Sequence, residues 1–160
     1  ASTPMGKVIS LAELLPELAG RKVVFTNGCF DLLHVGHLRT LQWARAQGEV
    51  LVLGLNSDAS VRLLKGANRP ITGEQDRAEL LAGFACVDYV VIFEEQTPME
   101  LLEQIRPAVH VKGGDYRPED LPEASLVKSW GGEVLVTPLI EGRSTTKIET
   151  QLRETPHHGQ

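Results

Sequence analysis

Residues 23–45 constrain the fold of this chain most, because they hold a strand, a glycine-containing turn and a helix in one uninterrupted run. Residues 23–26 are β-branched or aromatic, which is typical of a buried strand. Asn27-Gly28 then ends the strand with a strong turn-forming pair. From Leu38 onward the apolar side chains follow the spacing of a helix. The order strand, loop and helix predicts the repeating unit of a parallel α/β sheet.

Two histidines, His34 and His37, stand where this helix is expected to begin. The first backbone N–H groups of a helix are unpaired and carry partial positive charge, so they form a natural seat for phosphate. Imidazoles that face the same seat can donate N–H bonds to phosphate oxygens. The alternatives are a metal pair that includes Cys29, or loop histidines without a role. A metal needs three or four ligands, which no Cys/His cluster of the sequence supplies, so the setting favours phosphate.

The rest of the chain continues the alternation of strands and helices, without an internal repeat or a long linker. This order predicts the α/β class: a single Rossmann-like domain over residues 21–153, with a five-stranded parallel sheet and helices on both faces. Residues 1–20 are expected to form a loose lead-in as far as residue 9 and then a short helix that packs outside the main unit. Residues 154–160 are expected to be a disordered tail. The expected strands cover residues 23–26, 49–55, 88–93, 107–112 and 133–136.

Composition excludes several classes of protein. At 160 residues the chain makes one domain, and 42% apolar with 23% charged residues is ordinary for a soluble globular protein. The formal net charge of −5 argues against nucleic-acid binding, which needs a basic face, but not against binding a nucleotide. No apolar run approaches the about 18–20 residues of a membrane span, and the two distant cysteines give no disulfide framework. We therefore expect a cytoplasmic protein without nucleic-acid or membrane partners.

Polar residues and glycines follow two further expected strands. Asn56 and Asp58 come directly after the second strand, while Lys112 and Gly113-Gly114 end the fourth. Ligands of open parallel sheets bind at the carboxyl ends of the strands, and a glycine pair lets the backbone approach a ligand closely. The plain alternatives are a helix N-cap at Asp58 and a simple turn at the two glycines.

Cations and hydroxyls complete the expected phosphate site. Lys65 and Arg69 lie in an irregular basic loop, and Arg77 lies in the first turn of the next helix. Exposed cations are usually solvated, but a triphosphate needs several of them. An arginine near a helix start also opposes the helix dipole, which favours a ligand there. Residues 144–146, Ser-Thr-Thr, form a second anion seat, because a simple cap explains one hydroxyl but not three.

Together these motifs resemble the cytidylyltransferase-like nucleotidyltransferase superfamily and, within it, the D-glycero-β-D-manno-heptose 1-phosphate adenylyltransferases. The resemblance covers about residues 21–153. Its most specific pieces are the stretch Thr26–His37 and Val111-Lys-Gly-Gly-Asp-Tyr116. The other pieces are Asn56-Ser-Asp58, Lys65-Gly, Arg69-Pro70, Asp76-Arg77, Val87-Asp-Tyr-Val, Phe93-Glu-Glu-Gln-Thr-Pro98, Gly131-Gly-Glu-Val and Ser144-Thr-Thr146.

The resemblance implies transfer of AMP from ATP to heptose 1-phosphate, which yields pyrophosphate and the ADP-heptose used for lipopolysaccharide. It also implies Mg²⁺ as the partner of the triphosphate. The implied roles are catalysis by His34, His37, Lys65 and Arg77, metal placement by Asp31, contact with the acceptor by Asn56 and Asp58, and ATP binding by Thr26, Asn27, Gly28, Cys29, Phe30, Arg69, Lys112, Gly113, Asp115, Ser144, Thr145 and Thr146.

One alternative is a cytidylyltransferase that acts on glycerol 3-phosphate or a similar polyol phosphate. That family shares the histidines and the Ser-Thr-Thr-Lys form of residues 144–147, but it carries Arg about where Leu139 stands and Gly-Asp-Asp-Trp at residues 113–116. Conversely, Lys147 replaces an Asn that is frequent in the heptose enzymes. A second alternative is a nucleotide-binding module that has lost turnover. We expect only small molecules as partners, with a homodimer left open.

Overall fold

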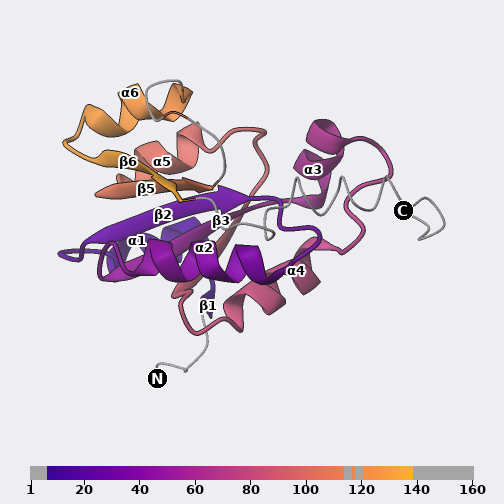
Figure 1. The fold of residues 1–160 in the computed structure, drawn as a ribbon. Coiled ribbons are helices and arrows are strands. Elements are labelled where there is room, and N and C mark those ends of the chain that lie inside the picture. Colours follow the sequence, from indigo (N-terminus) through magenta and orange to yellow (C-terminus); the bar gives the residue numbers. More distant parts are fainter. Residues whose placement is uncertain (1–6, 114–116, 118–120, 139–160) are drawn as a thin grey trace.

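The computed structural model describes residues 7–113, 117 and 121–138. These residues form a parallel sheet with helices on both faces (Figure 1). Six strands lie within the described part of the chain, in the spatial order β1-β4-β3-β2-β5-β6. The strands are β1 (Lys7–Val8), β2 (Val23–Gly28), β3 (Val50–Asn56), β4 (Tyr89–Phe93), β5 (Val109–Gly113) and β6 (Glu133–Thr137). The helices are α1 (Leu11–Glu17), α2 (Val35–Arg45), α3 (Asp58–Lys65), α4 (Glu74–Ala82), α5 (Met99–Ile105) and α6 (Pro122–Lys128).

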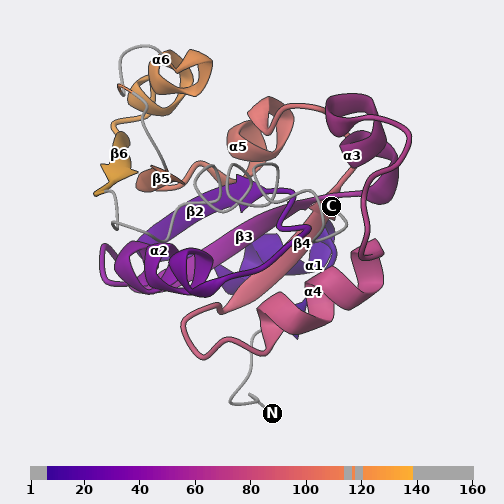
Figure 2. The same ribbon diagram turned by 45° about the vertical axis from the view of Figure 1, so that its right-hand side comes forward.

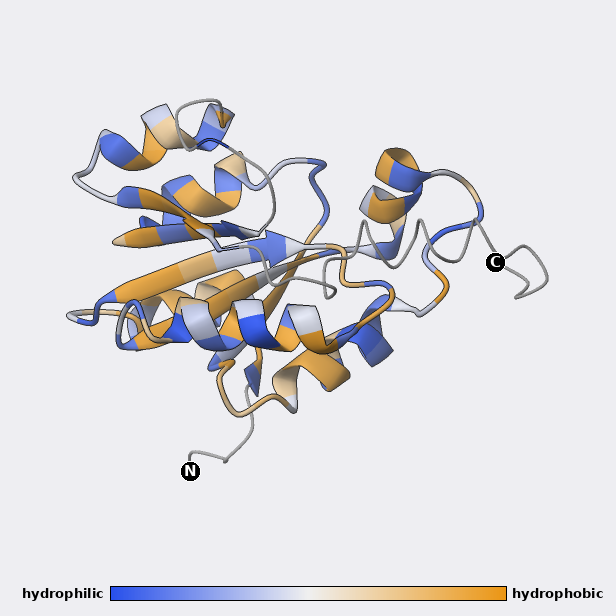
Figure 3. Ribbon diagram, in the orientation of Figure 1, coloured by the Kyte–Doolittle hydropathy of each residue, from blue (hydrophilic) through white to orange (hydrophobic). Residues whose placement is uncertain are grey.

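The central strands form because their side chains are apolar and can be buried on both sides of the sheet. Every residue of β3 is buried. Strand β2 pairs with β3 over its whole length, from Val23 opposite Val50 to Gly28 opposite Leu55. Near-continuous apolar runs are typical of parallel strands that are covered on both faces. In Figure 3 the hydrophobic colour runs along these strands, while the helices alternate between hydrophobic and hydrophilic residues.

Helices cover the sheet in two layers, as the alternating sequence predicts. Leu14 of α1, Leu102 of α5 and Val127 of α6 belong to the apolar cluster on one face. Leu41 of α2 and Leu81 of α4 belong to the cluster on the other face. The turned view of Figure 2 separates α5 and α6 from α2 and α4 across the sheet. The prediction of an α/β fold with helices on both faces is therefore confirmed.

Two expectations for the N-terminal segment are wrong. Residues 7–8 are not a loose lead-in but form β1, in which Lys7 pairs with Tyr89 of β4, so the sheet has one strand more than expected. Helix α1 does not pack outside the domain, because Leu14 is fully buried in the core. Two residues are too few to show the alternating pattern of a strand in the sequence. Backbone bonds to β4, such as Ile9 N to Val90 O at 3.0 Å, hold this segment in the sheet.

The strand order makes the carboxyl end of β2 the expected ligand-binding position of the sheet. This strand lies between β3, the next strand of the chain, and β5. The connections after β2 and before β5 run over opposite faces, which in open α/β sheets leaves a ligand-binding crevice at the strand ends. Two segments meet near this end through Asp31: residues 26–37, here called the histidine loop, and residues 65–72, here called the cation loop. Among the described residues, every helix is too short or too polar to cross a bilayer.

Candidate active site

The histidine loop leaves β2 at Gly28 and enters α2 at Val35. Within it Phe30 has a left-handed backbone conformation, with a φ of 48°. Its ring meets the His37 ring edge-on, with 5.4 Å between the centroids. A Cβ atom at Gly28 would lie only 2.9 Å from Phe30 Cε2, so any other residue would push this ring aside. The glycine therefore allows the contact that positions the His37 ring.

Both histidines accept hydrogen bonds from the backbone at the start of α2. Gly36 N donates to His34 Nδ1 at 3.0 Å, and His34 N donates to His37 Nδ1 at 3.2 Å. The two ring centroids are 4.1 Å apart. Because Nδ1 is the acceptor in each ring, the neutral form of each imidazole carries its proton on Nε2. From the sequence we expected the first amides of this helix to bind a phosphate, but in the structure the Gly36 amide bonds His34.

The electrostatics of the pair favour neutral rings at pH 7. Burial, the neighbouring His34 and the charge of Lys65 lower the pKa of His37 to about 4. Burial also lowers the pKa of His34. A neutral imidazole with its proton on Nε2 is a hydrogen-bond donor whose charge does not change across physiological pH.

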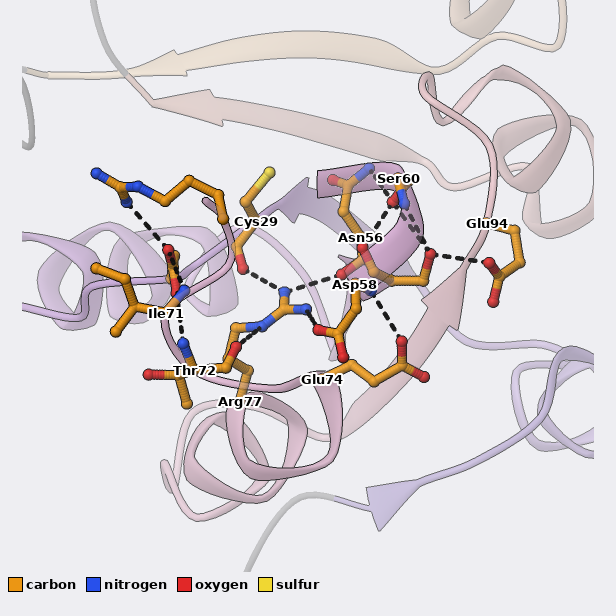
Figure 4. A network of polar contacts seen from close by, with 12 residues as sticks. Cys29, Asn56, Asp58, Ser60, Ile71, Thr72, Glu74, Arg77 and Glu94 are labelled. Atoms are coloured by element: carbon orange, nitrogen blue, oxygen red, sulfur yellow. Dashed lines mark hydrogen bonds and ion pairs between the residues drawn. The ribbon is translucent and has the colours of Figure 1, made fainter. Parts of the chain in front are cut away.

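Arg77 has a different position from the one expected. Its side chain is fully buried, and its guanidinium donates to four groups of the protein (Figure 4). Nε bonds Thr72 O at 2.8 Å, Nη1 bonds Cys29 O at 2.7 Å and Asn56 O at 2.8 Å, and Nη2 bonds Asp58 Oδ1 at 2.7 Å. From the sequence we expected the Arg77 guanidinium to reach the phosphates from its helix. The structure instead makes it a positioning residue, because all of its nitrogens bond three carbonyls and a carboxylate.

The two polar residues predicted after β3 have different environments. Asn56 is buried, and its amide donates to Ser60 Oγ at 3.3 Å and to Glu95 O at 3.4 Å, so its side chain organises the strand end. The Asp58 side chain keeps one third of its surface exposed while it bonds Arg77. Glu74 Oε1 accepts from the Asp58 backbone N at 2.8 Å. Asp58 therefore still fits the predicted contact with an acceptor, whereas the Asn56 side chain is engaged within the protein.

Asp31 joins the histidine loop to the cation loop. Its Oδ1 accepts from Ile71 N and Thr72 N, both at 2.9 Å, and its Oδ2 accepts from Arg69 Nη1 and Ile71 N, both at 3.0 Å. Burial of the carboxyl opposes ionisation, but these donors together hold its pKa below the usual value. Within the described residues no group of three or more His, Cys, Asp or Glu could hold a metal ion. The Asp31 environment does not fit the metal-placing role that the resemblance implies.

Comparison with known proteins agrees with this fold. Residues 25–151 match the Cytidylyltransferase-like family. The chain belongs to this family. Its relatives include two proteins named Bifunctional protein HldE. The one from Syntrophotalea carbinolica is 60% identical over 129 residues, which are 81% of this chain and 26% of that protein. The one from Koribacter versatilis is 55% identical over 148 residues, 89% of this chain and 30% of that protein.

Solved structures place the cytidylyltransferase-like chain in the same fold. A lipopolysaccharide core biosynthesis protein from Thermoplasma volcanium has a TM-score of 0.66 at 23% identity, covering 76% of this chain and 100% of its own. Pantothenate synthetase from Thermus thermophilus has a TM-score of 0.59 at 15% identity, covering 96% and 76%. Because both identities are low, these likenesses establish the fold alone. The chain spans between a quarter and a third of the length of the two HldE proteins.

The other predicted residues of the cytidylyltransferase-like site differ in what they contact. Thr26 is buried and donates its hydroxyl to Val111 O at 2.8 Å, which ties β2 to β5. Burial raises the pKa of the Cys29 thiol, which fits loop packing better than a nucleophile. Asn27 Oδ1 is buried and accepts no bond from the described residues. Lys112 and Gly113 end β5. Asp115, Ser144, Thr145 and Thr146, like the alternatives at Leu139 and Lys147, lie outside the described residues.

His110 of β5 and Glu123 of α6 form a buried titratable pair to which we assigned no role from the sequence. His110 Nε2 and Glu123 Oε2 are 3.5 Å apart, and both side chains are buried. His110 Nδ1 lies 3.3 Å from Phe25 O. The His110 imidazole, with a smaller contribution from Lys112, holds the pKa of the Glu123 carboxyl below its usual value although burial opposes this. The available signal was the strand alternation, which puts His110 and Lys112 on one face, but nothing in the sequence pairs them with Glu123.

Proposed function

We propose that this cytidylyltransferase-like chain is an adenylyltransferase, which transfers AMP from ATP to D-glycero-β-D-manno-heptose 1-phosphate and forms ADP-heptose for lipopolysaccharide. The observation that carries the proposal is the histidine pair at the end of β2, with Nδ1 of each ring held by a backbone amide. The high identity to the HldE proteins supports the sugar phosphate as acceptor. In the proposed step an oxygen of the sugar phosphate bonds the α-phosphorus, the bond from that phosphorus to the bridging oxygen breaks, and pyrophosphate leaves.

The proposed step needs no general base. A phosphate monoester is mostly a dianion at pH 7, because its second pKa is about 6. Catalysis then consists of in-line alignment and of stabilising the negative charge on the α-phosphate and the departing pyrophosphate. In this proposal His34 and His37 donate from Nε2, with His37 at the α-phosphate. Lys65 and Arg69 bring positive charge from the cation loop, and Asp58 faces the acceptor.

The remaining parts of the proposal concern the surroundings of the reaction. Mg²⁺ is the usual partner of a triphosphate and would supply charge neutralisation. We assign no step of the reaction to Mg²⁺, because Asp31 is bonded to the cation loop. We place the reaction in the cytoplasm, with ATP and the sugar phosphate as partners and without nucleic acid or membrane. A homodimer is the assembly to test, by light scattering after gel filtration.

Pyrophosphate release from four substrate pairs tests the function. ATP and CTP are each assayed with heptose 1-phosphate and with glycerol 3-phosphate. We expect release with ATP and heptose 1-phosphate to exceed the other three combinations. Preference for CTP and glycerol 3-phosphate would replace the proposal with the cytidylyltransferase alternative, which the Ser-Thr-Thr-Lys form of residues 144–147 favours. ATP binding without pyrophosphate from any sugar phosphate would favour a module without turnover.

A further inference from the structure

We infer that Asp31 is a positioning residue, which fixes the cation loop against the histidine loop so that Lys65 and Arg69 face the phosphates of ATP, and that it does not ligate the metal. This inference rests on the proposed function for the identity of the nucleotide. The contacts that carry it lie within the protein and can be tested without the acceptor sugar.

Asp31 makes several bonds to one short segment of the cation loop. Its carboxylate accepts from two consecutive amides, Ile71 and Thr72, and from the Arg69 guanidinium. These three residues lie at least 38 positions further along the chain than Asp31, so the bonds fix tertiary structure rather than a local turn. The Asp31 side chain is only 2% exposed. Bonds from several donors to a buried carboxylate are strong and are costly to lose.

Arg77 also bonds the segment of the cation loop that Asp31 holds. Thr72 N donates to Asp31, while Thr72 O accepts from Arg77 Nε at 2.8 Å. Arg77 Nη1 also donates to Cys29 O at 2.7 Å, inside the histidine loop. The backbone N–H of Thr72 is thus bonded to Asp31 of the histidine loop. Its carbonyl is bonded to Arg77, which also bonds Cys29 of that loop. Figure 4 shows the Arg77 guanidinium beside both Thr72 and Cys29.

The bonds to Asp31 fix one end of the cation loop. Residues 65–68 of the cation loop are exposed, whereas Arg69 is partly buried against Asp31. The loop enters from α3 at Lys65 and is fixed at residues 69–72. The charge of Lys65 already acts on both Cys29 and His37. Loss of the Asp31 bonds would release residues 69–72 from the histidine loop, so that Lys65 and Arg69 would no longer be held in position for the phosphates.

The Asp31 carboxylate leaves no room for a metal ligand bond. A divalent cation would have to replace donors that already occupy both carboxylate oxygens. It would also lie close to the Arg69 guanidinium, whose Nη1 is 3.0 Å from Oδ2, and like charges repel at that distance. No other His, Cys, Asp or Glu of the described residues joins Asp31 in a group of three. The same carboxylate cannot anchor the cation loop and hold a metal at once.

The test compares Asp31→Asn with Arg69→Gln, the double variant, and Asp88→Asn as a matched control. Asp88 also accepts from an arginine and a backbone amide, Arg45 and Leu51, but at the opposite end of the sheet. The kinetic measurement is the KM for ATP and the kcat of pyrophosphate release. We expect Asp31→Asn to raise the KM for ATP about tenfold, with a smaller change in kcat. The rise in KM of the double variant should be smaller than the product of the two single rises, and Asp88→Asn should match the wild type.

Two readouts need no sugar phosphate, so they separate this inference from the proposed function. Trypsin should cleave after Lys65 several times faster in Asp31→Asn than in the wild type at an unchanged melting temperature. Titration of the nucleotide-free protein with Mn²⁺ should broaden the Ile71 and Thr72 amide signals equally little in the wild type and in Asp31→Asn. Broadening of these signals in the wild type that disappears in Asp31→Asn would overturn the inference, as would a higher Mg²⁺ requirement with unchanged KM and cleavage. A melting temperature that falls while the KM stays normal would reduce Asp31 to a purely structural role and would also overturn it.

Discussion

Two arginine–aspartate pairs stand at opposite ends of β3. At the carboxyl end Arg77 Nη2 is 2.7 Å from Asp58 Oδ1, and at the amino end Arg45 Nε is 2.9 Å from Asp88 Oδ2. The groups and the distances are nearly the same. The arginine side chains differ in exposure, which is 1% for Arg77 and 37% for Arg45.

The difference shows where this fold places buried charge. A buried guanidinium loses its hydration, and only a complete set of acceptors offsets that cost. Arg77 has such a set, because three carbonyls supplement Asp58. Arg45 bonds Gly48 O and remains partly hydrated. The end of the sheet that carries the histidines is therefore held by bonds that tolerate little change, while the opposite end is held by an ordinary surface pair.

The largest expected effect is that of Arg77→Met. This change leaves three carbonyls and the Asp58 carboxylate without their donor, so we expect the free energy of unfolding in urea to fall by about 3–5 kcal/mol. Activity should fall with it, because the histidine and cation loops lose a shared contact. Arg45→Met is the matched control. A loss below that of Arg45→Met would show that burial of Arg77 is not what distinguishes the two pairs.

A smaller effect is expected from His110→Leu, which leaves Glu123 buried without its neighbour. The expected loss of unfolding free energy is about 1–3 kcal/mol. His110 Nε2 and Glu123 Oε2 are 3.5 Å apart and neither atom has a hydrogen-bond partner among the described residues, so this contact is weaker than those of Arg77. Replacing both residues with leucine should therefore recover most of the loss. A double variant less stable than His110→Leu would mean that the pair stabilises the fold in its own right.

The pH dependence of stability isolates the charged part of this pair. His110 holds the pKa of Glu123 below its ordinary value of 4.5, against the effect of burial. A carboxyl with a lowered folded-state pKa contributes stability above its ordinary pKa, and this is lost as the pH falls through the folded-state value. Between about pH 5 and about pH 3 the wild type should lose more stability than the double leucine variant. Parallel curves over this range would contradict the assigned cause.

The smallest expected effect is that of Arg45→Met. An exposed ion pair contributes about 0–1 kcal/mol to stability, and Asp88 keeps its bond from Leu51 N. Urea unfolding at low and at high salt should give nearly the same value for this variant. A loss as large as that of Arg77→Met would remove the contrast between the two ends of β3.

The sequence predicted five of the six described strands, the described helices and the place of the histidines, because apolar periodicity is a local signal. Asn27-Gly28 was expected to end the first strand, but both residues belong to β2 and pair with β3. The sequence did not predict where the buried polar groups find their partners. Arg77 was expected to face a ligand, because its sequence position shows an unfavourable helix dipole but not the carbonyls that compensate it. The family resemblance implied metal placement by Asp31, and the sequence could not show that residues 69–72 are its donors, because they lie about 40 positions away along the chain. Strand β1 was missed because two residues carry no pattern.

The most direct test of the proposed mechanism is pyrophosphate release by His37→Ala with ATP and heptose 1-phosphate. Loss of one preorganised donor to the α-phosphate should lower kcat by about 100-fold or more, while circular dichroism and the melting temperature show an intact fold. Near-normal kcat in a folded His37→Ala protein would contradict the central claim that the paired imidazoles stabilise the reacting phosphates.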